Sequence, residues 1–282
     1  MKRYFEGWYF KQQNGTQTVG LIPGIADDSA FIQVITDRRT FHIPYALSDF
    51  QLSKTGDRII IGQSCFTLNG LSLHIHYRDI TITGELRYRN PTPLKSDIMG
   101  VFRFFPMECR HGVVSLHHQV SGSLQINGEE ILFHDGTGYI EKDSGRSFPK
   151  SYTWLQSNDF DEKLSVMVSI AHIPFMTLHF QGLICAIWHN GMEYRLATYN
   201  GAKVIRASKN RIVITQGLYR LEADIFADGG HPLMAPSMGR MKRIIKENPA
   251  CPAHFRFYHG DRLIFDQHSP KASFEHVEAG TE

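Results

Sequence analysis

The chain has 282 residues, of which 42% are hydrophobic and 21% are charged. This length is sufficient for two domains of ordinary size, each with its own core. The 30 lysines and arginines nearly balance the 28 aspartates and glutamates, giving a net charge of +2, so the chain lacks the basic surface that nucleic acids and strongly anionic membranes attract.

The N-terminal segment reads MKRYFEGWYFKQQNG and contains no apolar run of the length that a signal peptide needs. No later segment is long enough to span a bilayer, so we expect a cytoplasmic protein. The cysteines are far apart in the sequence and form no C-x-x-C pair, which indicates separate reduced thiols instead of disulfides or a zinc site. They are Cys65, Cys109, Cys185 and Cys251.

Apolar and polar residues alternate with a period of two along much of the chain, which predicts β-strands. Examples are residues 71–77, 131–134, 164–170, 212–214 and 255–258. In the first of these, His74 and His76 share the polar face, where a solvated pair is more common than a metal site. Asn-Gly pairs, which favour tight hairpins, occur at 14–15, 69–70, 127–128, 190–191 and 200–201. The fold class is therefore expected to be all-β and antiparallel.

A repeat indicates two copies of one β unit. The segment from Arg58 to Phe66 resembles that from Arg211 to Tyr219, and the strand with Trp8 has a counterpart with Trp154 at nearly the same separation. Chance similarity between short strands is the alternative interpretation. The repeat predicts domains at residues 1–137 and 138–282.

One segment in the second half reads as a helix. It runs from Ser237 to Lys246, follows two prolines and ends before Asn248 and Pro249. Its mixture of apolar and basic residues suits a surface helix that closes one end of a barrel, or a helix that touches a membrane. We favour the first interpretation.

Residues 139–156 read YIEKDSGRSFPKSYTWLQ and combine charges with aromatic rings. In an extended chain Tyr139, Glu141 and Asp143 lie on one face. After the breaks at Gly145 and Pro149, a second face carries Tyr152, Trp154, Gln156 and Asn158. One interpretation is an ordinary ion pair of a carboxylate with Lys142 or Arg146 at a strand end. The other is a carboxylic acid held among rings, where burial raises its pKa and allows it to donate a proton near neutral pH.

Three motifs resemble the tocopherol cyclase family. They are YFEGWYFK at 4–11, the run Y-x-E-K-x-x-G-x-x-F-P-x-x-x-x-W-x-Q-x-N from Tyr139 to Asn158, and G-x-x-Y-x-x-x-x-x-N-G from Gly191 to Gly201. The resemblance extends in order over nearly the whole chain. At one position this chain departs from the plant enzymes, because it has Ser144 where they have tryptophan.

The resemblance implies two lipocalin-like antiparallel β-barrel or sandwich domains in tandem. It also implies an enzyme that closes a ring on a prenylated phenol or quinol. In that reaction an acid protonates an alkene of the prenyl tail, and the phenolic oxygen captures the carbocation. The reaction needs no redox cofactor and no metal.

The candidate catalytic residues are Glu141 and Asp143, one of which supplies the proton, with Lys142 and Arg146 adjusting its pKa and orientation. Glu141 is preferred because it matches the family motif directly. The candidate substrate-binding residues, taken from the motifs and their neighbours, are Glu6, Trp8, Tyr9, Tyr139, Phe148, Tyr152, Trp154, Gln156 and Asn158.

The expected partner is an apolar small molecule, with peripheral membrane contact as a further expectation and no nucleic acid. A lipocalin-like cavity also binds apolar ligands without chemistry, so a carrier is the alternative function. The charged and aromatic motif favours the enzyme. No P-loop, dinucleotide-binding or G-x-S-x-G motif occurs, which argues against NTPase, dehydrogenase and hydrolase functions.

Overall fold

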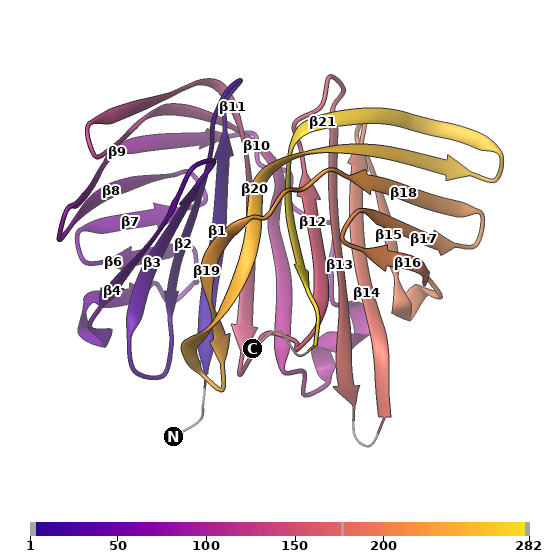
Figure 1. Cartoon of the computed structure of the whole chain (residues 1–282), viewed down its shortest axis with the longest axis horizontal. Coiled ribbons are helices and arrows are strands. Elements are labelled where there is room, and N and C mark those ends of the chain that lie inside the picture. The colour runs from indigo at the N-terminus through magenta and orange to yellow at the C-terminus, as the bar shows by residue number, and fades with distance from the viewer. Residues whose placement is uncertain (1–3, 176–177, 280–282) are drawn as a thin grey trace.

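The computed structural model describes residues 4–175 and 178–279, with side chains up to residue 173 and from residue 180. Its strands form two antiparallel sheets that stand side by side (Figure 1). The first sheet has 11 strands in the order β4-β3-β2-β1-β11-β10-β9-β8-β7-β6-β5. Their bounds are β1 (Phe5–Gln13), β2 (Thr18–Ile25), β3 (Ala30–Thr36), β4 (Thr40–Tyr45), β5 (Phe50–Leu52), β6 (Arg58–Ile61), β7 (Ser64–Thr67), β8 (Gly70–Tyr77), β9 (Ile80–Arg89), β10 (Cys109–Ile126) and β11 (Glu129–Gly145).

The second sheet has 10 strands in the order β15-β14-β13-β12-β21-β20-β18-β17-β16, and β19 pairs with β20 beside this path. Their bounds are β12 (Tyr152–Ser157), β13 (Leu164–Phe175), β14 (Leu178–His189), β15 (Met192–Ala197), β16 (Lys203–Ser208), β17 (Arg211–Gln216), β18 (Tyr219–Ile225), β19 (His231–Ser237), β20 (Arg240–His259) and β21 (Arg262–Val277). Three short 3-10 turns join strands: η1 (Leu47–Asp49), η2 (Gly100–Phe104) and η3 (Thr198–Asn200). The prediction of an all-β fold with two antiparallel units is confirmed. Both sheets are open, because within the described residues the end strands of a sheet do not pair with each other.

The chain passes from the first sheet to the second between Gly145 and Tyr152. Residue 137, where we placed the domain boundary, lies inside β11, which belongs to the first sheet. The sheets therefore divide the chain a few residues later than the repeat indicated. That each sheet is a separate domain stays a prediction.

The alternating pattern positions the side chains as expected. On β8, Leu73 and Ile75 are buried in the first core, whereas His74 and His76 are exposed. The Asn127-Gly128 and Asn190-Gly191 turns adopt positive φ at both residues, from 48° to 84°, as the two-residue turns of hairpins require. The sequence pattern thus accounts for individual strands and for several of their connections.

Strand order repeats between the sheets. β1, which carries Trp8, lies between β2 and β11, and β12, which carries Trp154, lies between β13 and β21. The two segments that suggested the repeat do not take matching places. β6 begins at Arg58 and is four strands from β10, whereas β17 begins at Arg211 and is two strands from β20. The two sheets therefore correspond in strand order around β1 and β12. The similarity of short segments does not identify this correspondence.

The helix expected from Ser237 to Lys246 is wrong. Ser237 ends β19 and Arg240 begins β20, and Met238 and Gly239 between them form a tight turn with φ of 54° and 81°. Residues of β20 then alternate, so that Ile245 is buried while Ile244 is exposed. The apolar residues of this segment are spaced three and four apart, which resembles a helical stripe, but they do not all lie on one face of the strand. No helix in the described ranges is long and apolar enough to cross a membrane.

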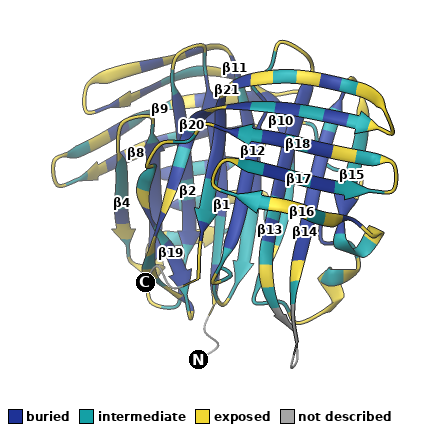
Figure 2. Ribbon diagram, turned by 45° about the vertical axis from the view of Figure 1, so that its right-hand side comes forward, coloured by how far each residue is buried: buried dark blue, intermediate teal, exposed yellow. Residues whose placement is uncertain are grey.

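Each sheet packs an apolar core of its own, and a third buried cluster lies where the sheets meet. Strands in this central region, such as β12, are buried along their whole length (Figure 2). The third cluster includes Tyr9, Tyr139 and Trp154 from the predicted motifs. All four cysteines are free, as expected, and Cys185 and Cys251 pack in the core of the second sheet.

The β19–β20 hairpin links the second sheet to the first. Figure 1 shows it reaching toward β3 and β4, where the amide of Gln33 exchanges two hydrogen bonds of 2.8 and 2.9 Å with the backbone of Met234. Because Gln33 is only 2% exposed, water does not compete for these bonds. The hairpin therefore fixes how the beginning of β20 lies against the first sheet.

Candidate active site

A cavity of about 160 Å³ lies between the two sheets. Its wall is mainly apolar and aromatic, with several acidic side chains and two histidines. The aromatic lining comes from Phe5, Trp8, Tyr9, Phe31, Phe102, Phe148, Tyr152 and Trp154, and the titratable side chains other than tyrosines are Glu108, Cys109, His111, Glu141, Asp143, His172, Glu247 and Glu275. Apolar pockets with a few convergent polar groups are the usual form of a small-molecule site.

Glu141 is held at the middle of the first sheet. On β11 it lies between Tyr9 of β1 and Val113 of β10, its partners in the two ladders. Alternation along β11 directs Glu141 and Asp143 toward the cavity. The long β11 thus carries the acidic part of the motif from the first sheet into the space between the sheets.

Three donors surround one oxygen of Glu141. Oε2 accepts a hydrogen bond of 2.6 Å from the Tyr139 hydroxyl and one of 3.1 Å from Trp154 Nε1, and His111 Nε2 lies 3.4 Å away. Within the described residues no hydrogen bond ends on Oε1 of Glu141, which leaves that oxygen to carry a proton. Burial of the carboxyl outweighs His111 and the two donors and raises the pKa of Glu141 to about 7.

His111 stands between two carboxylates. Its Nδ1 lies 3.0 Å from Asp143 Oδ1, while its Nε2 faces Glu141. Burial alone would lower the pKa of His111, but the Asp143 and Glu141 carboxylates more than offset this and raise it to about 9. The three side chains also have the donor types of a metal site. Because each ring nitrogen faces a different carboxylate, a protonated imidazole places positive charge beside both of them.

A second acidic pair faces the first across the cavity. Glu247 of β20 and Glu275 of β21 are direct cross-strand partners. The Tyr9 hydroxyl donates to Glu247 at 2.5 Å, and the Tyr152 hydroxyl donates to Glu275 at 2.5 Å. Burial is the main cause that raises the pKa of Glu247 to about 7, and burial together with the neighbouring Glu247 raises the pKa of Glu275 well above its usual range. This pair therefore holds at least one proton at neutral pH.

Most of the predicted aromatic residues meet at the cavity. Tyr9, Phe148, Tyr152 and Trp154 line it, and the rings of Tyr9 and Trp154 meet edge to face at 5.5 Å. Tyr139 is fully buried behind the wall and reaches the site through its hydroxyl. The structure thus brings residues of the N-terminal and central motifs together.

Lys142 is on the opposite face of β11, and this separates it from the acids. Its ammonium pairs with Glu6 and lies 4.7 Å from the centre of the Trp8 ring. Trp8 borders the cavity, but its ring packs in the core of the first sheet and stacks on Phe50. Arg146 is exposed at the end of the motif. Lys142 and Arg146 therefore do not take the places beside Glu141 that we expected, and His111 takes that place instead.

Gln156 and Asn158 lie in a buried polar layer next to the cavity. The Lys11 ammonium donates to Gln156 Oε1 at 3.0 Å, and Gln13 Nε2 donates to Asn158 Oδ1 at 2.9 Å. Lys11 is fully buried, which lowers its pKa to about 8. This layer bonds β1 of the first sheet to β12 of the second, so these two residues position the sheets and do not line the cavity wall.

Sequence reasoning missed His111, Glu247 and Glu275. Each lies on a strand far in sequence from the central motif, and the helix assigned to Ser237–Lys246 hid the alternation that directs Glu247 inward. A usable signal existed for Glu275. It is an acid at an inward position, between the buried Ser273 and Val277.

The acidic pair predicts how stability depends on pH. The pKa of Glu247 rises from an ordinary 4.5 to about 7 on folding, so its stabilising effect is complete below pH 4.5 and is lost as pH rises through about 7. The Glu247→Gln variant cannot lose a proton there. Relative to wild type it should gain on the order of 3 kcal/mol of unfolding free energy between about pH 5 and about pH 8.

Urea titrations of both proteins at the two pH values measure this difference. The exposed Glu85→Gln is the matched control and should follow wild type. If Glu247→Gln and wild type lose stability in parallel, Glu247 is not a protonated group in the folded protein.

Two solved structures show the same fold. The structure of CghA with Sch210972 has a TM-score of 0.63 and 9% identity, covering 99% of this chain and 90% of that one. Kievitone hydratase from Nectria haematococca has a TM-score of 0.56 and 10% identity, covering 97% of this chain and 88% of that one. At these identities the similarity establishes the fold alone. No curated protein matches the sequence.

The sequence comparison with protein families is more specific. The tocopherol cyclase-like family matches residues 67–275, which include β11, β12, β20 and most of β21, and with these strands four of the acidic residues at the cavity. This agrees with the resemblance seen in the motifs. The chain belongs to the tocopherol cyclase-like family.

Proposed function

We propose that the protein is an acid catalyst that protonates an alkene of an apolar, prenylated phenol or quinol and so allows an oxygen to capture the carbocation. The observation that carries this proposal is Glu141, a carboxyl with a pKa raised to about 7 in an aromatic cavity. An ordinary glutamate is ionised at neutral pH and has no proton to donate. Family membership supports the same reaction type.

The first step uses the proton on Glu141 Oε1. The proton adds to the less substituted alkene carbon, the π-bond breaks, and a tertiary carbocation forms while Glu141 becomes a carboxylate. The hydroxyl of Tyr139, the indole N–H of Trp154 and the imidazolium of His111 stabilise that carboxylate. Because these donors are already in place, they need no rearrangement when the charge develops.

The second step uses the aromatic wall and the opposite acids. The faces of rings such as Trp154 and Tyr152 attract a carbocation that water does not solvate. A phenolic oxygen of the substrate then forms the C–O bond and releases its proton. Glu247, which is near its pKa at neutral pH, accepts this proton, and proton exchange restores Glu141 for the next cycle. The substrate is neither oxidised nor reduced.

A mass measurement tests the proposal. The protein is incubated with a hydroquinone that carries one prenyl chain, and the products are separated by chromatography and weighed. An isomer of unchanged mass supports capture by the internal oxygen, and a product heavier by one water supports the same protonation with capture by water. The name kievitone hydratase makes the second outcome relevant, because that protein has this fold.

The carrier remains the alternative function. A carrier needs the apolar cavity but has no use for several buried acids, which cost stability when they ionise. If hydroquinones with prenyl chains of different lengths all bind tightly and none gives a product, the carrier function replaces the proposed catalytic function.

The reaction should slow as pH rises. The reactive form has a protonated Glu141, and the pKa of this carboxyl is about 7. We therefore expect kcat to fall about tenfold for each further pH unit above it. A stopped assay across the pH range measures this profile. A rate that increases through the same range would assign Glu141 the role of a base.

A further inference from the structure

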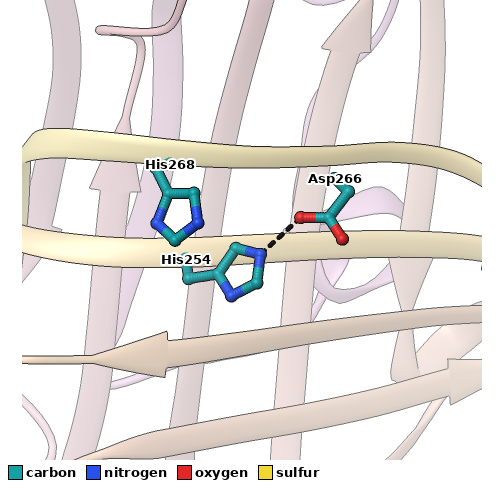
Figure 3. Close-up of side chains that lie close together, drawn as sticks. All are labelled: His254, Asp266 and His268. Atoms are coloured by element: carbon teal, nitrogen blue, oxygen red, sulfur yellow. Dashed lines mark hydrogen bonds and ion pairs between the residues drawn. The ribbon is translucent and has the colours of Figure 1, made fainter.

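Three potential metal ligands gather on the surface of the second sheet, outside the cavity. They are His254 of β20 and Asp266 and His268 of β21 (Figure 3). One ligand atom from each lies within 4.8 Å of those of the other two. We propose that these side chains bind a divalent transition-metal ion of the Zn²⁺ type.

The strand register explains why the three side chains meet. His254 and His268 are direct cross-strand partners, and Asp266 is two residues before His268 and so on the same face of β21. The imidazole rings lie parallel, with centres 4.0 Å apart and planes 7° apart. His254 Nε2 already bonds Asp266 Oδ1. The backbone therefore places two imidazole nitrogens and a carboxylate oxygen within reach of one ion, which the side chains would bind by rotating out of this stack.

The ligand set matches the chemistry of Zn²⁺. Unprotonated imidazole nitrogens and a carboxylate oxygen are ligands that zinc accepts at about 2.0–2.2 Å, and two histidines with one acid are a common set. Calcium and magnesium prefer oxygen ligands throughout, so they are poor candidates. Three protein ligands leave a position for water.

The surrounding charges leave Asp266 free to bind a metal. Arg256 is its direct cross-strand partner, but Arg256 forms ion pairs with Glu222 and Asp224. Asp224 also pairs with Arg211. Among the described residues, Asp266 forms an ion pair with His254 alone. Asp266 and His268 are exposed, so an ion reaches them directly from solvent.

A bound ion would join the two strands that carry the second acidic pair. β20 carries Glu247 and β21 carries Glu275. These two residues face each other across the same ladder that pairs His254 with His268. The register between them is irregular, with shifts between Asn248 and Cys251 and between Cys251 and Ala253. The metal would be a cross-link beyond this irregular section and would stabilise the folded protein in proportion to its occupancy.

Calorimetric titration with ZnCl₂ tests the site on tag-free, chelator-treated protein. We expect one equivalent to bind to wild type, and His268→Gln and Asp266→Asn to weaken binding by at least about 10-fold. The matched control is His134→Gln, which removes an exposed histidine that also contacts an aspartate, Asp135, and it should bind as wild type does. Zinc should raise the midpoint of thermal unfolding of wild type and of His134→Gln, but not of His268→Gln.

Three outcomes would overturn the proposal. One is the absence of saturable binding, and another is binding that is equal in wild type and both site variants. The third is binding that His111→Gln abolishes and His268→Gln preserves, because this would place the ion in the cavity. The first two outcomes do not bear on the alkene chemistry, which the assay with the hydroquinone tests separately.

Discussion

The Glu141→Gln variant should lose turnover by about 100-fold or more while it still binds the substrate. Glutamine keeps the shape of the side chain and an oxygen that accepts from Tyr139 and Trp154, but it has no acidic proton. The loss should therefore appear in kcat and leave the binding constant nearly unchanged. Single-turnover assays and equilibrium binding on the same preparation separate these two quantities.

Two further variants make the comparison specific. Asp143→Asn should have a smaller effect, because Asp143 reaches Glu141 through the imidazole of His111. Glu130→Gln changes an exposed glutamate on the same strand and should leave turnover intact. If Asp143→Asn abolishes turnover and Glu141→Gln does not, then Asp143 supplies the proton and our assignment is wrong.

Trp154→Ala should destabilise the protein by about 3 kcal/mol, at the lower end for removal of a buried aromatic ring because one side faces the cavity. The ring is 5% exposed, meets Tyr9 edge to face and donates to Glu141. These contacts join β12 of the second sheet to β1 and β11 of the first. Urea unfolding of wild type and variant measures the difference.

The Trp154→Phe variant separates packing from hydrogen bonding. Phenylalanine retains the ring contact with Tyr9, so most of the stability should return. Because the indole N–H lowers the pKa of Glu141, its loss should move the fall in kcat to higher pH. An unfolding free energy of Trp154→Ala within about 1 kcal/mol of wild type would show that the ring does not hold the sheets together.

Local patterns in the sequence predicted the strands and one half of the site. The period-two alternation placed Glu141 and Asp143 on one face, and Tyr139 and Trp154 are close enough in sequence to share the motif with them. The same alternation places Lys142 on the other face, where the structure has it. Lys142 therefore does not lie beside the acid, although the two are neighbours in the sequence.

The other half of the site depends on which strands become neighbours. His111 approaches Glu141 because β10 pairs with β11. Glu247 and Glu275 face it only because the second sheet packs against the first, with Tyr9 and Trp154 in contact between them. Strand order and sheet packing arise from long-range contacts, and no local pattern in one sequence encodes them.

The cavity takes Glu141 from one sheet and Glu247 and Glu275 from the other, so the proposed activity should depend on the contact between the two sheets. A small separation of the two sheets would admit water to the cavity and ionise the acids, even if the strands within each sheet stayed paired. Mild heating should then abolish the proposed turnover at temperatures where the circular dichroism spectrum still shows intact strands.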